Sequence, residues 1–241
     1  MTERGASGSQ PVHSVRYLID QKVPMRDGVN LSADVLLPRG PGSFPTILHR
    51  TPYQSNNESR LSRGTWWARR GYAFVSGDCR GRYESEGTFY PYHTEGEDGY
   101  DTLEWIAGQP WSDGKIGTWG PSYGGLFQWQ LAPLGSPHLT CMASHVICDD
   151  YFSDLHYVGG AFQLALSLLS SINFTTNETT PSFAEIFDPG RLLRPLPLID
   201  MDEVVSGERN ELWRDLEPPS MRLRSCSTRA KYTNTRLFWH R

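Results

Sequence analysis

The chain has 241 residues, of which 38% are hydrophobic and 21% charged, and its formal net charge is −4. This length suffices for one sizeable α/β core with an insertion and is short for two full domains. The near balance of 23 basic and 27 acidic residues excludes nucleic acid as the main partner, because that role calls for a basic stripe.

Several common kinds of segment are absent from the sequence. The residues from Met1 carry no apolar stretch suited to a secretory signal, and no run reaches the roughly eighteen apolar residues of a membrane span. The four cysteines form no C-x-x-C pair and have no histidine at metal-ligand spacing. They are Cys79, Cys141, Cys148 and Cys226. We therefore expect a cytoplasmic protein with reduced thiols, without a membrane, a metal or a cofactor, and with Cys141 and Cys148 in or beside a strand.

The first part of the chain predicts strands. Residues 1–15 are small, polar and rich in Gly and Ser, and we expect them to be disordered. Residues 23–37 are typical of two strands joined by an Asp-Gly turn, which is a strong hairpin signal. Short apolar runs at 44–49 and 71–76 indicate central parallel strands.

Helices alternate with further strands. Residues 59–70 predict a helix that ends at Gly71, and residues 94–106 combine capping-box spacing with apolar residues at helical intervals. A strand, a helix and another strand follow at 115–119, 123–132 and 141–147. Because strand and helix alternate, the sequence predicts an α/β fold with a mostly parallel, doubly wound sheet in residues 16–150.

The pattern changes after Asp150. Residues 151–169 have a helical, aromatic-rich pattern, and the segment that follows is rich in Ser, Thr and Asn. Together they suggest a helical cap over residues 151–217. Residues 218–241 hold several basic residues, no acid and no period, so we assign no structure to this tail.

Residues 120–124, Gly-Pro-Ser-Tyr-Gly, fit the G-x-S-x-G pattern of a nucleophile elbow between a predicted strand and a predicted helix. On so sharp a turn the serine backbone is strained, and flanking glycines leave room for the strand and the helix to cross. The turn lifts the Ser122 hydroxyl into a cleft and aims the Tyr123 N–H at an oxyanion. The alternative is a tight turn without chemistry.

Further motifs accompany the elbow in order along residues 23–162. They are PMRDGV at 24–29, RTPY at 50–53, GDCRG at 77–81, DTLEWI at 101–106 and GTWGPSY at 117–123. On these motifs the chain resembles the X-Pro dipeptidyl-peptidase and cocaine esterase (CocE/NonD-like acyl esterase) family of the α/β-hydrolase superfamily. The resemblance implies an α/β-hydrolase fold and a small ester or peptide substrate.

The resemblance also implies roles for single residues. Ser122 matches the nucleophile, and Tyr53 matches the tyrosine whose phenol joins the Tyr123 N–H in the oxyanion hole. The alternative for Tyr53 is a half-buried structural tyrosine after a strand. Asp78 and Arg80 match a signature that we interpret as a structural ion pair near the site. In the cap, Tyr157 and Phe162 either line the acyl pocket or pack against the cap itself.

The segments that carry the acid and the histidine of the family's catalytic triad have no match in this sequence. A serine nucleophile needs a base, and the base needs an orienting acid. The family carries these in a Gly-Trp-Tyr-Asp-type and a Ser-His-type segment beyond the cap, followed by a jelly-roll domain, and this sequence contains none of them. The remaining histidines after Ser122 lack the context of a base; they are His138, His145, His156 and His240. Asp149 is a weak candidate acid. We therefore expect a reading frame that is truncated or shifted near residues 212–215.

Two functional classes remain open, and a third is disfavoured. The chain is either a serine hydrolase of esters or amides, or a catalytically inactive fragment that at most binds acyl groups or a partner. A nucleotide-binding protein is disfavoured because no phosphate-binding G-x-x-x-x-G-K-[ST] motif occurs. An incomplete sheet with an exposed edge would also favour a homo-oligomer.

Overall fold

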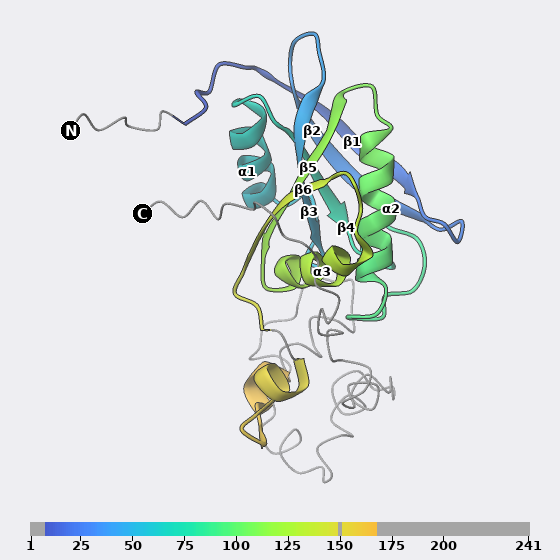
Figure 1. The fold of residues 1–241 in the computed structure, drawn as a ribbon, viewed down its shortest axis with the longest axis vertical. Coiled ribbons are helices and arrows are strands. Elements are labelled where there is room, and N and C mark those ends of the chain that lie inside the picture. Colours follow the sequence, from blue (N-terminus) through green and yellow to red (C-terminus); the bar gives the residue numbers. More distant parts are fainter. Residues whose placement is uncertain (1–7, 149–150, 168–241) are drawn as a thin grey trace, which may run out of the picture. The chain divides into compact units, whose positions relative to one another are not determined.

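The computed structural model describes residues 8–148 and 151–167 (Figure 1). The chain divides into two compact units. The core unit holds the sheet and comprises residues up to Thr88 together with Thr94–Val146. The second unit comprises Phe89–His93 and the chain from Ile147 onward. The cap residues 168–217 and the tail 218–241 that the sequence predicts lie outside the described residues.

Six strands of the core unit form one sheet in the order β1-β2-β4-β3-β5-β6. The strands are β1 (Val15–Pro24), β2 (Asn30–Pro38), β3 (Phe44–Thr51), β4 (Ala73–Asp78), β5 (Ser112–Pro121) and β6 (Leu139–His145). The β2 strand pairs antiparallel with both β1 and β4, whereas β4, β3, β5 and β6 run parallel to one another. The predicted mostly parallel sheet is confirmed.

The β1–β2 hairpin forms as predicted, and its Asp-Gly turn places Gly28 at φ 87°. The β1 strand begins earlier than the predicted strand, at Val15. Its register shifts between Leu18 and Gln21, where the Asp20 N–H donates a hydrogen bond to the Asp34 carboxylate at 2.8 Å. The bulge explains why the apolar alternation of β1 is hard to read in the sequence.

Helices cover both faces of the sheet (Figure 1). Helix α1 (Glu58–Ala68) packs on one face, where Leu36, Ala68 and Phe74 form a buried cluster. Helices α2 (Glu95–Ala107) and α3 (Tyr123–Leu131) contribute to the larger core on the other face. Their buried core residues are Leu103, Ile106, Phe127 and Leu131. The doubly wound arrangement is therefore also confirmed. A short 3-10 turn, Ala132–Leu134, follows α3.

The cap of α2 differs from the prediction. Thr94 precedes the helix with φ −98° and ψ −1° and makes no capping hydrogen bond. Its hydroxyl instead donates to the Asp98 carboxylate at 3.1 Å. An N-cap side chain needs an extended backbone to reach the free N–H groups, and Thr94 lacks it.

The described residues 151–167 are not the continuous helix that the sequence predicts. A π-type turn (Tyr151–His156) is followed by a small hairpin of β7 (Tyr157–Val158) and β8 (Ala161–Phe162). Gly159 and Gly160 have φ values of 61° and 84°, which only glycine adopts readily, so this Gly-Gly pair favours a tight turn over a continuous helix. The Tyr157 and Phe162 rings contact each other across the hairpin, with centroids 5.1 Å apart.

Within the described ranges, no helix is long and apolar enough to cross a membrane, and no cluster of His, Cys, Asp or Glu could hold a metal ion. Cys79, Cys141 and Cys148 are free thiols. Cys141 lies on β6 and Cys148 shortly after it, as predicted, whereas Cys226 lies outside the described residues.

The packing of α2 on the sheet generates a test of the fold. Leu103 is 0% exposed, and its replacement by Ala leaves a cavity in the core. We expect Leu103→Ala to lower the free energy of unfolding by about 2–5 kcal/mol, measured by urea denaturation. Leu134→Ala is the matched control, because Leu134 is 44% exposed. Equal losses in both variants would contradict this assignment of the core.

Candidate active site

The sharp turn between β5 and α3 places Ser122 at the surface of the core unit. Ser122 has φ 53° and ψ −125°, a backbone conformation that serine rarely adopts. The residue is exposed to solvent. Its N–H donates to the His145 carbonyl at the end of β6 (3.1 Å), and its carbonyl accepts from the Gly125 and Leu126 N–H groups (2.7 and 3.0 Å). The predicted nucleophile elbow therefore has the expected strand–turn–helix geometry.

Two glycines allow this turn to close. A Cβ at Gly120 would lie 2.7 Å from the Gly124 carbonyl oxygen, which is closer than real contacts permit. A Cβ at Gly124 would lie 3.2 Å from His49 Nε2 and 3.3 Å from the Arg50 carbonyl oxygen of β3. The close approach of β5 and α3 thus requires glycine at position 120, and β3 leaves little room for a larger residue at position 124.

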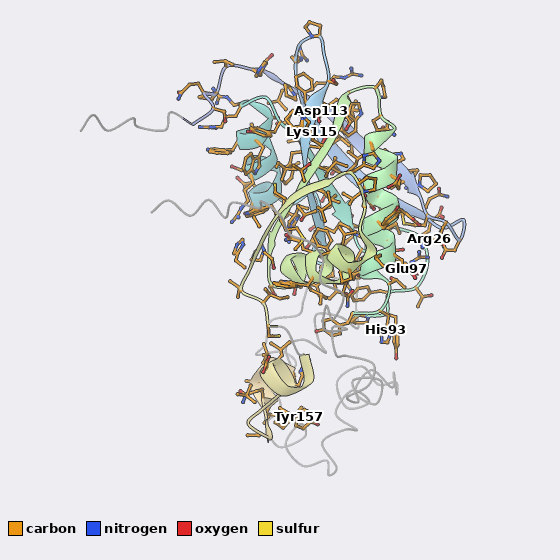
Figure 2. The ribbon with its side chains drawn as sticks, viewed as in Figure 1. Arg26, His93, Glu97, Asp113, Lys115 and Tyr157 are labelled. Atoms are coloured by element: carbon orange, nitrogen blue, oxygen red, sulfur yellow. The ribbon has the colours of Figure 1, made fainter. Side chains whose placement is uncertain are left out.

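The elbow lies at the carboxyl end of β5. Figure 2 shows the charged side chains of Asp113 and Lys115 near the other end of this strand, away from α3. Tyr53 follows β3, and β3 and β5 are parallel neighbours, so both strands deliver their following loops to the same edge of the sheet.

Tyr53 and Ser122 are brought together there. The Tyr53 side chain is hydrogen-bonded to the Ser122 side chain, and burial raises the pKa of the phenol above its usual value. The ring of Tyr53 also lies edge-on to the ring of Tyr123, with centroids 6.5 Å apart. A half-buried phenol in this position can donate a hydrogen bond to negative charge that develops beside the Ser122 oxygen.

The loop that carries Tyr53 is tied to the end of β4. The Ser55 N–H and hydroxyl both donate to the Asp78 carboxylate, at 2.6 and 3.0 Å. Burial raises the pKa of Asp78 to about 7. Arg82 Nε donates to the Pro52 carbonyl at 3.1 Å, so groups after β4 hold the loop on both sides of Tyr53.

A buried ion pair holds the Tyr123 side chain. The Tyr123 hydroxyl donates to Glu95 Oε1 at 3.1 Å, and Glu95 Oε2 lies 3.1 Å from Arg50 Nη2. The side chains of Arg50 and Glu95 are each 1% exposed. Neither residue was predicted from the sequence to belong to the site. Arg50 belongs to the RTPY motif, which could have indicated that it lies near the site. Glu95 gave no such indication, because a glutamate in the first turn of a helix normally faces solvent.

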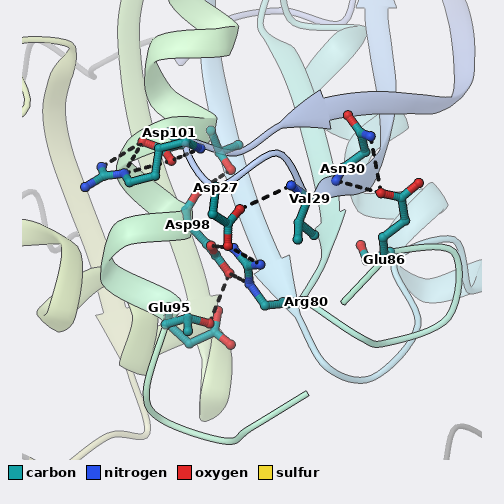
Figure 3. A network of polar contacts seen from close by, with 12 residues as sticks. Asp27, Val29, Asn30, Arg80, Glu86, Glu95, Asp98 and Asp101 are labelled. Carbon is teal, nitrogen blue, oxygen red and sulfur yellow. Dashed lines mark hydrogen bonds and ion pairs between the residues drawn. The ribbon is translucent and has the colours of Figure 1, made fainter. Parts of the chain in front are cut away.

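Arg80 extends this network, but differently from the prediction. Its guanidinium pairs with Asp98 on α2 at 2.6 Å and with Asp27 in the β1–β2 turn at 2.8 Å (Figure 3). Asp78 instead accepts hydrogen bonds from Ser55. The expected Asp78–Arg80 pair is therefore replaced by two separate sets of contacts, because the carboxylates of other elements lie within reach of Arg80.

Four described histidines have side-chain contacts within their own unit. His138 Nε2 lies 3.6 Å from Glu104 Oε2, and the His145 ring packs on Trp119 with centroids 5.8 Å apart. His156, in the second unit, has Nδ1 2.9 Å from Ser167 Oγ, and burial lowers its pKa to about 4. His49 is buried beneath the elbow, where burial lowers its pKa to about 3. Asp149 and His240 lie outside the described residues.

The backbone of Ser122 generates a stability prediction. Glycine adopts this positive-φ conformation without a steric penalty, whereas alanine does not. We expect Ser122→Gly to have a free energy of unfolding about 1 kcal/mol higher than Ser122→Ala, measured by urea denaturation. A less stable Ser122→Gly would show that the turn is not strained.

The chain is similar in sequence or in structure to several known proteins. Over 147 residues the chain is 41% identical to cocaine esterase from Rhodococcus sp. (strain MB1 Bresler), a match that covers 59% of this chain and 26% of that protein. The solved CocE/NonD family hydrolase from Staphylococcus aureus superposes with a TM-score of 0.59 at 25% identity, covering 78% of this chain and 39% of the other.

A solved aminopeptidase from the archaeon Thaumarchaeota superposes over 90% of this chain and 40% of its own, with a TM-score of 0.68 at 24% identity, and so supports the fold alone. The fold is the α/β-hydrolase fold expected from the sequence. The chain spans about a quarter of the length of the curated relatives that it matches.

The sequence model of one hydrolase family matches residues 27–221, which is more than half of the chain and includes Tyr53, Ser122 and Tyr123. The chain belongs to the X-Pro dipeptidyl-peptidase (S15) family.

Proposed function

We propose that this chain carries the nucleophile and the oxyanion hole of a serine hydrolase that cleaves ester or amide bonds through an acyl-enzyme on Ser122. The observation that carries the proposal is the exposed Ser122 on a strained turn, with its side chain hydrogen-bonded to Tyr53. Membership in a family of esterases and peptidases supports the same reaction class.

In the proposed reaction the Ser122 oxygen attacks the substrate carbonyl carbon while a base accepts the hydroxyl proton. The Tyr53 phenol and the Tyr123 N–H donate hydrogen bonds to the oxyanion of the tetrahedral intermediate. The intermediate then expels the alcohol or amine, which takes up the proton, and leaves an acyl group on Ser122. Water attacks this ester and releases the acid, which restores the serine.

A second candidate is a chain that binds acyl groups without efficient turnover. It is favoured by one observation, namely that His138 and His145, the histidines of the core unit after Ser122, contact Glu104 and Trp119. An elbow and an oxyanion hole without a base would keep a residual rate of ~10³–10⁴ over water and lose most of the catalysis. Small esters and X-Pro or amino-acyl peptides are the proposed ligands in either case.

The test of the proposed function is hydrolysis of a short-chain nitrophenyl ester, together with labelling by a fluorophosphonate. We expect Ser122→Ala to abolish labelling and to lower kcat by ~10⁴-fold or more, because the nucleophile is removed. Ser62→Ala, at an exposed serine of α1, is the control and should keep both activities. A folded wild-type chain that neither turns over ester nor reacts with the probe would favour the binding-only candidate.

The proposed role of Tyr53 has its own test. Tyr53→Phe removes only the phenolic hydroxyl, so we expect kcat to fall by about 10²–10³-fold while KM changes little. The control is Tyr17→Phe, because the Tyr17 hydroxyl is bonded to Thr65 on the exposed side of α1. Unchanged kcat in Tyr53→Phe would leave Tyr53 as the structural tyrosine of the alternative interpretation.

A further inference from the structure

The loop that presents Tyr53 is bound at its centre by one guanidinium. Arg60 Nη1 donates to the Tyr53 carbonyl and to the Gln54 carbonyl, both at 2.8 Å. Arg60 Nη2 donates to Thr51 Oγ1 at 3.0 Å. Thr51 Oγ1 in turn accepts the Tyr53 N–H at 3.0 Å. One side chain of α1 therefore contacts Thr51 at the end of β3, the tyrosine and the residue after the tyrosine.

This stretch of backbone needs such a partner. Gln54 has φ 65°, in the left-handed region that a glutamine adopts at a cost. The conformation turns the carbonyls of Tyr53 and Gln54 toward the same donor, and two carbonyl dipoles that converge repel each other unless a cation lies between them. The amide of Asn57, the N-cap of α1, adds longer contacts of 3.4 and 3.3 Å to the same two oxygens.

The position of Arg60 is itself fixed by the start of α1. The backbone N–H of Arg60 donates a hydrogen bond to the N-cap side chain, Asn57 Oδ1, at 3.1 Å, so Arg60 lies in the first turn of the helix. Its side chain points back to the loop that precedes the helix. A planar guanidinium can contact three acceptors in one fixed arrangement, which an ammonium on a flexible stem cannot reproduce.

We propose that Arg60 is a positioning residue of the oxyanion hole, which fixes the Tyr53 phenol against Ser122 by holding the two carbonyls of the Tyr53–Gln54 turn. This inference deepens the proposed function and rests on it. The contacts that Asp78 and Arg82 make with the loop do not fill this role. Asp78 binds the loop at Ser55, and Arg82 binds it at Pro52. Arg60 contacts the carbonyls of the tyrosine and of the strained residue after it at 2.8 Å, whereas Asn57 reaches the same two oxygens only at 3.4 and 3.3 Å.

The first measurement is a double-mutant cycle between Arg60 and Tyr53 on a nitrophenyl ester. If Arg60 acts through the phenol, Arg60→Gln lowers kcat on the order of tenfold with little change in KM when Tyr53 is present. In the Tyr53→Phe background the same substitution has almost no further effect. Arg60→Lys recovers part of the loss, because an ammonium reaches one of the carbonyls. Equal losses in both backgrounds would overturn the proposal.

The second measurement is independent of turnover. A fluorotyrosine introduced at position 53 alone reports the surroundings of this ring by its fluorine resonance. We expect Arg60→Gln to move that resonance toward its position in the denatured chain. Arg69→Gln should leave it in place, since Arg69 is an exposed arginine directly after α1. Circular dichroism checks that each variant is folded, and Arg60→Lys replaces Arg60→Gln in both measurements if the latter does not fold.

The two measurements separate the two proposals. A wild-type chain without esterase activity would count against the proposed function, and the fluorine resonance would still decide whether Arg60 sets the position of Tyr53. A resonance that Arg60→Gln leaves unchanged would overturn the positioning role even in an active chain.

Discussion

The constraint around which the proposed site is arranged is the buried ion pair between Arg50 and Glu95, whose Nη2 and Oε2 atoms lie 3.1 Å apart. A charge removed from water is costly unless it is paired, so loss of either partner would leave an uncompensated buried charge. Arg50 is the second-last residue of β3, which leads into the Tyr53 loop, and Glu95 begins α2. Glu95 also accepts a hydrogen bond from the Tyr123 hydroxyl. The ion pair therefore connects β3, which leads to Tyr53, with α3, which begins at Tyr123, and these residues carry the proposed oxyanion-hole donors.

This arrangement means that the geometry around Ser122 is set before a substrate arrives. The Ser122 backbone is held by β6 and by the first turn of α3, and its φ of 53° is maintained by packing rather than by local preference. Tyr53 is held from α1 and from the end of β4. Electrostatic stabilisation of an oxyanion is most effective when its hydrogen-bond donors need no reorganisation. Contacts from several elements hold Ser122 and Tyr53 in place and so meet that condition.

The sequence predicted the sheet because its signals are local. The Asp-Gly turn, the apolar runs and the alternation of strand and helix each depend on neighbouring residues. The observed elements of the sheet and its helices follow them within a few positions, except that β1 begins much earlier, at Val15. Ser122 and Tyr53 were predicted from motifs and from the resemblance to a family. The roles of Glu95 and Arg80 could not be predicted, because the partner of a charged side chain depends on which distant elements the fold brings within reach. The β7–β8 hairpin was missed because a helical apolar pattern outweighed a Gly-Gly turn.

The parallel strands explain why the proposed chemistry gathers at one edge of the sheet. Tyr53 follows β3, Asp78 ends β4, Ser122 follows β5, and the carbonyl that holds Ser122 ends β6. The backbone N–H and carbonyl of Ser122 are both occupied, and Tyr53 lies against its side chain. The core side of the elbow is filled by buried residues of α3, among them Tyr123 and Gly124. A base that serves Ser122 must therefore approach from the exposed side of the elbow, the side from which a substrate carbonyl also enters, so one face has to admit both groups.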